Sequence, residues 1–343
     1  MHPQRDRADR RRRAQDGRAV APPRFGRKNR SCGRHTGTRS ILSSKALWHD
    51  DVVTSRTYAD RCPGVLRPWI ADDGALIRLR LVGGSLSSES LRKLAEIAAE
   101  WGNGNIHLTS RANLQLRGIA HDTGRVPPAL VDAITAAGLL PVPSHELVRN
   151  ITVSPLTGRV GGRADLRPLA DVIDKLLCAD PLFASLSGKF LFSLDDGRGD
   201  VAGSTLDLGI FALDAHTAQL RVGSTLWGPT VDLNAAAHAL LGLAREFLGL
   251  RGAGDTAWWH VDELPDKGAE LLDGPCERDE RTLMTSAPPA LGKIGQDDGR
   301  QALHVEVPDG TLTPQLAEQV AGLGAELLVT PWRSVIVPDL EPA

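Results

Sequence analysis

The sequence has little of what metal centres, membrane spans and export signals require. Its four cysteines are far apart and form no C-x-x-C pair, whereas zinc and iron–sulfur sites usually contain a close pair. The pattern therefore predicts reduced structural thiols and no metal ligands. They are Cys32, Cys62, Cys178 and Cys276. No apolar run reaches the ~18 residues of a membrane span. The Arg-rich N-terminus has no apolar segment typical of a secretory signal, so we expect a cytoplasmic protein without a membrane partner.

Nucleotide-binding signatures are also missing. No G-x-G-x-x-G motif follows a strand pattern, and no P-loop is present. The ten histidines form no i, i+4 pair of the kind that binds a metal on one helix face. Dinucleotide, nucleoside triphosphate and helical metal sites thus have no local support.

The net charge of −2 hides a strong asymmetry along the chain. Residues 1–57 contain thirteen Arg, two Lys and five Asp, which gives +10 and leaves −12 for the remainder. The basic segment has no hydrophobic period, which predicts a disordered extension. The acidic remainder argues against nucleic-acid binding by the folded body.

Two similar segments, Asp73–Ile119 and Asp298–Leu340, organise the rest of the chain. Each has the pattern strand, Gly turn, helix, strand, strand. Ser87 is the expected N-cap of the first helix, and Thr313, followed by Pro, is that of the second. Their buried stripes are expected to include Leu91, Leu94, Ala95 and Ala98 in the first helix and Leu316, Val320 and Leu323 in the second. Because the copies are far apart in sequence, we expect a packed pseudo-symmetric pair and not a solenoid.

The segment between the copies alternates strand and helix patterns irregularly. Strands are expected within 145–158, 188–197, 204–213 and 218–223, and helices over 165–177 and 232–250. The first helix should bury Leu169, Val172, Ile173 and Leu176, and the second should begin at an Asp232 cap. Irregular alternation favours an α+β fold over a doubly wound parallel sheet.

Basic and amide side chains line two expected strands of the first copy. In "TSRANLQLRG", period two places Arg111, Asn113, Gln115 and Arg117 on one face. In "LIRLRLVGG", Arg78 and Arg80 share a face in the same way. If both strands join one sheet, the four arginines would crowd together and repel. One explanation is a solvated sheet face. The other, favoured by the lack of acidic residues on these faces, is a site for a flat ligand rich in carboxylates.

Four motifs resemble the sulfite/nitrite reductase family, most closely its precorrin-3B synthase branch. They are "LIRLRLVGG", "LTSRANLQLRGI", "VRNITVSP" and "GKFLFSLDDG", and the resemblance extends from about Cys62 to Leu340. It implies an α+β fold in which two ferredoxin-like half-domain repeats flank a sirohaem-binding-type α/β lobe. The expected domains are a disordered basic extension (1–57), a first half-domain (58–145), the tetrapyrrole-binding lobe (146–290) and a second half-domain (291–343) truncated at its end.

The resemblance also implies roles for individual residues. Arg80, Arg111 and Gln115 match anion-binding positions of the family, and Arg149 with Asn150 matches another. Lys189 matches the first of two lysines that sulfite reductases place over their substrate, while Leu191 stands where the second would be. We therefore expect Lys189 and Arg149 to act in catalysis. The expected tetrapyrrole-binding residues are Arg78, Arg80, Arg111, Asn113, Gln115, Arg117 and Asn150. Trp258, Trp259 and His260 are interpreted as packing residues and receive no chemical role.

The implied activity is an oxidoreductase of aerobic cobalamin biosynthesis that hydroxylates precorrin-3A with dioxygen, a monooxygenase reaction. Family members carry a 4Fe-4S cluster and a haem or sirohaem-type iron, but cluster cysteines are missing from this sequence. A separate C-terminal iron–sulfur half or another electron donor would have to supply electrons, with the tetrapyrrole as substrate. The alternatives are a sirohaem-dependent nitrite or sulfite reductase, which Leu191 disfavours, and a non-catalytic tetrapyrrole-binding protein.

Overall fold

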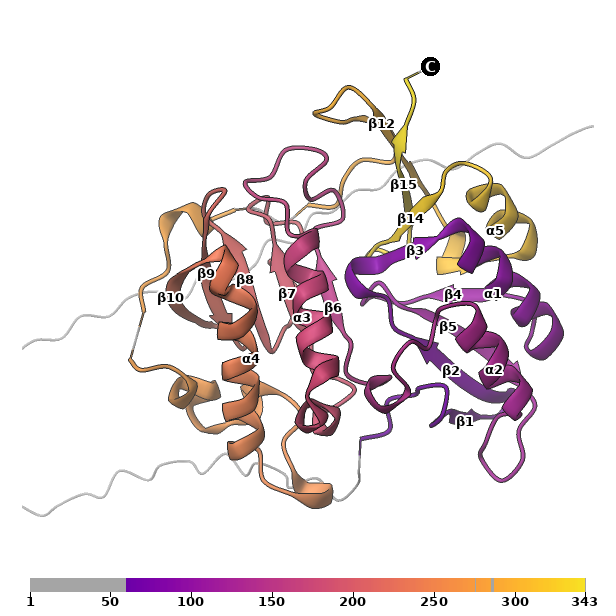
Figure 1. Cartoon of the computed structure of the whole chain (residues 1–343), viewed down its shortest axis with the longest axis horizontal. Coiled ribbons are helices and arrows are strands. Elements are labelled where there is room, and N and C mark those ends of the chain that lie inside the picture. Colours follow the sequence, from indigo (N-terminus) through magenta and orange to yellow (C-terminus); the bar gives the residue numbers. More distant parts are fainter. Residues whose placement is uncertain (1–59, 275, 285–286, 343) are drawn as a thin grey trace, which may run out of the picture. The chain divides into compact units, whose positions relative to one another are not determined.

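The computed structural model describes residues 60–274, 276–284 and 287–342, all within one compact unit, Thr54–Ala343. The basic extension expected over residues 1–57 lies outside this part. The described residues form α-helices and three five-stranded sheets (Figure 1). No helix in the described ranges is long and apolar enough to cross a membrane.

The first sheet has the strand order β1-β2-β5-β4-β13. Three strands come from the first copy of the repeat, β1 immediately precedes that copy, and β13 comes from the second copy. Their bounds are Trp69–Ala71 (β1), Gly74–Leu79 (β2), Leu114–Ile119 (β5), Ile106–Leu108 (β4) and Thr311–Leu312 (β13). Strands β2 and β5 pair antiparallel, with Arg78 opposite Gln115, so the two polar faces do coincide as predicted.

The second sheet repeats this plan with the roles of the copies exchanged. Its order is β11-β12-β15-β14-β3, and β3 comes from the first copy. The bounds are Gly292–Gly295 (β11), Gln301–Val305 (β12), Val335–Leu340 (β15), Glu326–Val329 (β14) and Ser85–Ser87 (β3). Each copy therefore donates one short edge strand to the other, which makes the two copies the predicted pseudo-symmetric pair.

Helices of both copies pack on the two sheets and share one hydrophobic core. Helix α1 (Ser88–Trp101) begins at Ser87, whose side chain accepts a hydrogen bond from the Ser90 amide, and α5 (Pro314–Ala321) begins at Thr313 in the same way. Both caps agree with the sequence. Helix α1 ends at Gly102, and α2 (Pro128–Ala136) is a further helix that the sequence analysis did not predict. Leu323 is exposed because α5 ends before it, so its expected burial is wrong.

The third sheet belongs to the lobe between the copies, in the order β10-β9-β8-β7-β6. Strands β6, β7 and β8 are parallel, whereas β8, β9 and β10 are antiparallel, which is a mixed sheet. The bounds are Ile151–Val153 (β6), Phe192–Asp195 (β7), Leu208–Ala212 (β8), Thr217–Val222 (β9) and Leu226–Asp232 (β10). Helices α3 (Arg167–Ala179) and α4 (Leu233–Leu250) lie side by side on this sheet (Figure 1).

In the lobe, the predicted helix cap is confirmed, whereas one of the predicted buried residues is exposed. Asp232 caps α4 as predicted, because its carboxylate accepts from the Asn234 amide. Leu169 and Ile173 of α3 are buried, but Val172 is exposed and its expected burial is wrong. The helix buries only one narrow stripe, and Val172 lies beside it and not within it.

The stretch 109–113 is a turn and not the start of a strand. Ala112 has φ 55°, its amide donates to the Thr109 carbonyl, and the Thr109 side chain accepts from the Asn113 amide. The left-handed residue breaks the two-residue period, so the predicted common face holds only from Leu114 onward. This turn redirects Arg111 away from the sheet, which matters for the site.

Candidate functional site

The first basic side chains of the site stand on paired strands of the first sheet. Arg78 on β2 donates from Nη2 to Oε1 of Gln115 on β5, at 3.2 Å. The opposite faces of these strands carry Ile77, Leu79 and Leu116, which are almost completely buried in the shared core. Core packing on one face therefore fixes the direction of the polar side chains on the other.

Arg80 follows the last residue of β2 and is buried, with 4% of its surface exposed. Its Nη1 donates to the Pro63 carbonyl at 2.9 Å, and its Nη2 lies 3.5 Å from the Gly188 carbonyl oxygen. Its Nε has no hydrogen-bond partner among the described residues, and neither has the Nε of Arg78. Two guanidiniums thus keep unused donors in a largely buried place.

The 109–113 turn brings Arg111 to the same backbone segment. Arg111 Nη1 donates to the carbonyl of Lys189 at 2.7 Å, next to the Gly188 carbonyl that Arg80 approaches. The segment 187–189 is itself held in place, since Asp60 accepts hydrogen bonds from Ser187 Oγ and from the Gly188 amide. Two arginines from one half-domain therefore converge on the chain just before β7 of the lobe.

Two asparagines connect the half-domain to the lobe in the same place. Asn113 accepts from the Leu81 amide through Oδ1 and donates from Nδ2 to Oδ1 of Asn150, at 3.2 Å. Asn150 in turn donates to the Gly188 carbonyl at 3.1 Å. Both amides are buried and act as positioning groups, because their hydrogen bonds are used within the protein.

Lys189 lies between the arginines and an aromatic wall. Its Nζ stands 4.5 Å from the ring centroid of Trp259, a cation–π distance. This contact orients the ammonium group toward the segment that contains His260.

The arginines of the site have no carboxylate partner. No acidic side chain of residues 60–342, within the described ranges, forms an ion pair with Arg78, Arg80 or Arg111. Burial, together with a smaller effect of the Arg78 charge, lowers the pKa of Arg80 to about 10. Burial also lowers the pKa of Arg78, to which the charge of Arg111 contributes. The three cations therefore disfavour one another, and a bound anion would relieve that cost.

Two predicted residues have carboxylate partners, unlike the arginines of this cluster. Arg117 is near the far end of β5, where its guanidinium forms an exposed bidentate pair with Asp73. The expected crowding of Arg117 with the other arginines is therefore wrong, since the β1–β2 turn supplies its own carboxylate. Arg149 forms a bidentate pair with Asp174 of α3 at 2.7 and 2.8 Å, and this pair raises its pKa despite the opposing effect of burial.

Two hollows adjoin the cluster and differ greatly in size. Arg78, Arg80 and Arg149 line a crevice of about 10 Å³, which is room for one water molecule at most. Arg111 lines an open pocket of about 290 Å³, close to the lower limit of small-molecule sites. Of these two hollows, only the one beside Arg111 has room for part of a small-molecule ligand.

The other wall of the Arg111 pocket contains a histidine–aspartate pair. His260 Nδ1 lies 3.2 Å from both carboxylate oxygens of Asp207, which is 1% exposed. Sequence reasoning assigned His260 no chemistry, because Asp207 is 53 positions away and no local motif links the two. Only the folding of 259–261 against the start of β8 brings them together.

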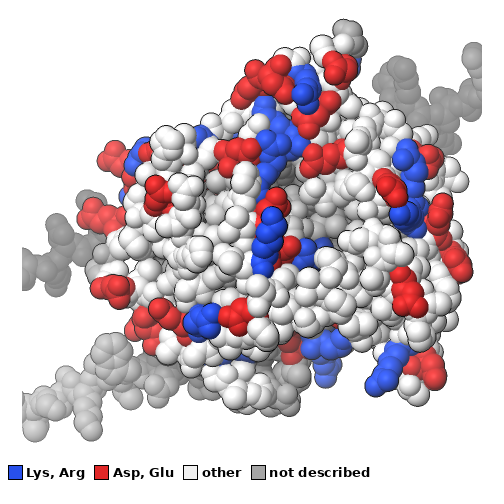
Figure 2. Space-filling view, in the orientation of Figure 1, with Lys and Arg blue, Asp and Glu red and all other residues white. Residues whose placement is uncertain are grey.

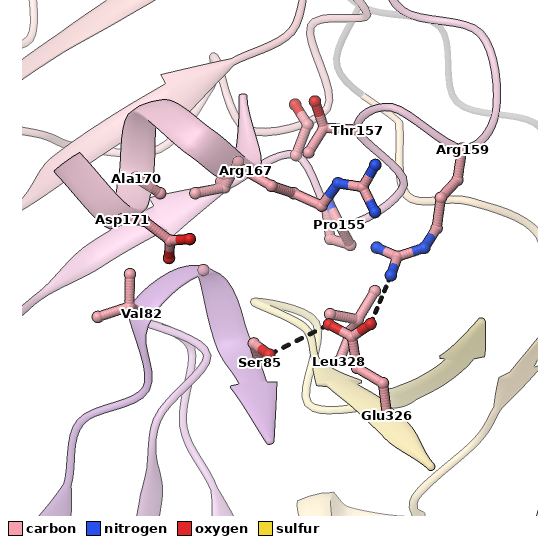
Figure 3. A pocket seen from close by; sticks show the side chains of 13 residues that line it. Val82, Ser85, Pro155, Thr157, Arg159, Arg167, Ala170, Asp171, Glu326 and Leu328 are labelled. Atoms are coloured by element: carbon pink, nitrogen blue, oxygen red, sulfur yellow. Dashed lines mark hydrogen bonds and ion pairs between the residues drawn. The ribbon is translucent and has the colours of Figure 1, made fainter. Parts of the chain in front are cut away.

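Another cavity, of about 210 Å³, lies at the junction of the lobe with both half-domains (Figure 3). Its cations are already paired: Arg159 binds Glu326 and Asp339, and Arg167 binds Asp165. The same interleaving of basic and acidic side chains appears on the face in Figure 2, near α3 and β3. This cavity therefore lacks the excess positive charge that a polycarboxylate needs.

The described residues do not fit an iron–sulfur cluster. Such a cluster takes four cysteine ligands, whereas Cys62, Cys178 and Cys276 lie on different elements and belong to no group of potential ligands. One acidic trio, Asp195, Asp196 and Asp200, does gather its oxygens within 4.8 Å. Arg198 pairs with that trio, so it carries no argument for a metal.

Comparison with known proteins shows which proteins this chain resembles. Residues 71–123 match the nitrite/sulfite reductase ferredoxin-like half domain. Similar proteins include a ferredoxin–nitrite reductase of Leptolyngbya laminosa (33% identity over 42% of this chain) and a precorrin-3B synthase of Sinorhizobium sp (33% over 47%). A ferredoxin–nitrite reductase of Synechococcus elongatus is 31% identical over 78% of this chain. The chain spans only 29%, 31% and 59% of these three relatives.

The fold has a match among solved structures. The Mycobacterium tuberculosis NirA protein superposes with a TM-score of 0.63 over 83% of this chain and 58% of its own length, at 21% identity. Together with the half-domain match, this confirms the predicted α+β fold. The chain is therefore a relative of the sulfite/nitrite reductase family, with oxidoreductases, a precorrin-3B synthase among them, as its similar proteins.

Proposed function

We propose that this chain binds a polycarboxylate tetrapyrrole and belongs to an oxidoreductase of the precorrin-3B synthase type. The substrate would be precorrin-3A, hydroxylated with dioxygen in aerobic cobalamin biosynthesis. Electrons would come from an iron–sulfur partner or another donor, because the described cysteines do not fit a cluster. The proposed domain limits, 58–145, 146–290 and 291–343, remain those inferred from the sequence.

One observation carries the binding proposal: the three arginines Arg78, Arg80 and Arg111 gather with no carboxylate partner in the described part of the chain. Burying cations without compensation is costly, and proteins normally pair them. A ligand carboxylate bound at Arg111 would supply the missing charge through a charge-assisted hydrogen bond worth ~1.5–3 kcal/mol. Lys189, 4.5 Å from Trp259, is the second cation that we assign to the site.

The second candidate is a sirohaem-dependent nitrite or sulfite reductase. A ferredoxin–nitrite reductase matches 78% of this chain, which favours this alternative. Against it, Leu191 is 4% exposed and presents no charge where sulfite reductases carry a second lysine. A non-catalytic tetrapyrrole binder would share the site and differ only in lacking turnover.

The binding proposal is tested with uroporphyrin, whose rim carries acetates and propionates, and with coproporphyrin, which has methyl groups in place of the acetates. Each is titrated into the purified chain, and the shift of the Soret band is measured. We expect saturable binding of uroporphyrin and weaker binding of coproporphyrin. Arg111→Gln should weaken uroporphyrin binding by about 10–100-fold, the equivalent of the lost charge-assisted hydrogen bond.

Arg117→Gln is the matched control, because it removes an arginine of the same motif that is paired with Asp73 outside the cluster. It should leave the affinity within about twofold. Equal losses in the two variants, or no saturable binding by the wild type, would refute the site. Adding precorrin-3A, dioxygen and a reductant, followed by mass spectrometry of the product, then distinguishes the enzyme from the silent binder.

A further inference from the structure

The pocket beside Arg111 has a second functional wall, built by Asp207 and His260. The pocket is lined by Arg111, Thr205, Leu206, Asp207, His260 and two acidic residues of the following turn. The His260 side chain is 31% exposed, whereas Asp207 behind it is 1% exposed. The imidazole therefore forms the boundary between a buried carboxylate and open space.

Asp207 is a rigid support for the ring. Its Oδ2 accepts from the Leu191 amide and its Oδ1 from the Val261 amide, both at 2.8 Å. These backbone donors already satisfy both oxygens. The buried carboxylate is therefore stable in the interior without a hydrogen bond from His260. The additional approach of Nδ1 at 3.2 Å to both oxygens fixes the orientation of the ring.

The backbone that carries His260 is fixed as well. The amides of Trp259 and His260 both donate to Oε2 of Glu263, at 2.7 and 3.3 Å. Asp262 is held in turn by the Ser224 amide at 2.8 Å. The imidazole thus has little freedom, which is what a side chain that exchanges a proton with a bound ligand requires.

The tautomer follows from these contacts. A carboxylate at Nδ1 favours the proton on that nitrogen, as in other carboxylate–histidine pairs. In the neutral ring, Nε2 is then the basic nitrogen. Asp207 approaches the ring at Nδ1, so Nε2 is the nitrogen left for a ligand.

We propose that His260 is a proton-exchanging residue of this pocket. When an anionic ligand binds beside Arg111, Nε2 takes up one proton from solvent and donates the resulting N–H to a ligand oxygen. Asp207 stays ionised and balances the imidazolium, and the proton returns to solvent when the ligand leaves. The ligand class rests on the proposed tetrapyrrole-binding function, whereas the proton exchange rests on the Asp207–His260 geometry.

The charges around the ring fit this role. Asp207, Asp262 and Glu263 line the pocket together with the ring, from the start of β8 and from the 261–263 turn. Arg111 lines it from the segment before β5. An anion bound at Arg111 neutralises that cation, which favours the imidazolium form in the complex.

The test measures proton uptake when uroporphyrin binds. Calorimetric titrations at neutral pH in two buffers of different ionisation enthalpy give the number of protons taken up per ligand. We expect net uptake by the wild type and an affinity that falls by up to about tenfold per pH unit as the pH rises above neutrality. His260→Gln should abolish this component of the uptake and flatten the pH profile, with Asp207→Asn reducing both.

The exposed His216, changed to Gln, is the matched control and should leave uptake unchanged. Circular dichroism establishes that each variant is folded, and imidazole nitrogen NMR of the free wild type reports the tautomer independently. A neutral ring protonated on Nε2, or uroporphyrin binding with the same uptake in His260→Gln, would overturn this inference and leave the binding proposal intact. Absence of uroporphyrin binding by the wild type would overturn both.

Discussion

The two copies of the repeat have nearly the same backbone but different polar faces. In the strand-entry turns, Ala112 and Arg333 occupy equivalent positions with φ 55° and 60°. Near the ends of the following strands, Gly118 and Asp339 also match, with φ 70° and 61°. Non-glycine residues rarely adopt this conformation, so its recurrence shows that the turn geometry is built into the repeat.

The side chains at equivalent positions have diverged completely. Where the first copy presents Arg78, Arg80, Arg111 and Gln115, the second presents His304, Glu306, Trp332 and Ile336. His304 is buried, and its Nε2 lies 2.6 Å from the Ser334 hydroxyl, a small neutral network in place of a cation cluster. One backbone thus carries a cluster of arginines in the first copy and a packed face in the second.

The largest expected difference between the copies concerns the glycines that precede the exchanged strands. A Cβ at Gly84 (φ 75°) would overlap the carbonyl oxygen of Val329 on β14, whereas one at Gly310 (φ 64°) would meet only the Arg333 side chain, at 3.0 Å. We expect Gly84→Ala to lower the free energy of unfolding by about 3 kcal/mol or more. Gly310→Ala should cost about 1 kcal/mol. Urea denaturation measures both, and equal losses would contradict the asymmetry.

A medium effect is expected at the arginines that bind the ends of the two sheets. Arg159 of the lobe is buried and holds Asp339 through Nε and Nη2, with Glu326 as a further partner, whereas Arg117 holds Asp73 at the surface. Arg159→Gln should cost ~1.5–3 kcal/mol of unfolding free energy. Arg117→Gln should cost less than ~1 kcal/mol and serves as the control. Equal losses of unfolding free energy in the two variants would show that burial does not determine the contribution of these ion pairs.

The smallest expected effect is the acid dependence of these carboxylates. Burial opposes ionisation of Asp339, but hydrogen bonds from Arg159 and Gln296 outweigh it and lower its pKa. A lowered folded-state pKa adds stability above the unfolded value of ~3.9, and that stability is lost as the pH falls through the folded value. We therefore expect Asp339→Asn to flatten the stability profile below about pH 4. Thermal melts across that range measure it, with Asp73→Asn as the surface counterpart.

Local signals predicted the elements of the fold well. Caps at Ser87, Thr313 and Asp232 determine helix starts through bonds to the next residues, so a sequence reveals them directly. The exchange of β3 and β13 left no such signal, because strand partners depend on residues more than 200 positions apart. The two-residue period failed at Ala112, where a left-handed residue was not expected.

The sequence predicted those parts of the site that residue type alone indicates, and it could not predict contacts between distant residues. Arginines without acidic neighbours in sequence indicated Arg78, Arg80 and Arg111. The sequence could not show that Arg117 meets Asp73, that Arg149 meets Asp174, or that His260 meets Asp207. Each of these pairs depends on how strands and helices pack, which motif spacing does not record.

The reciprocal exchange of edge strands also has a consequence for synthesis on the ribosome. The edge of β4 stays uncovered until residues 311 and 312 have been translated, because β13 is its partner. Strand β3 likewise waits for β14, which begins at Glu326. An unpaired edge can recruit other nascent chains. This protein should therefore depend on chaperones until nearly all of its sequence has emerged, whereas the lobe between the copies can fold earlier.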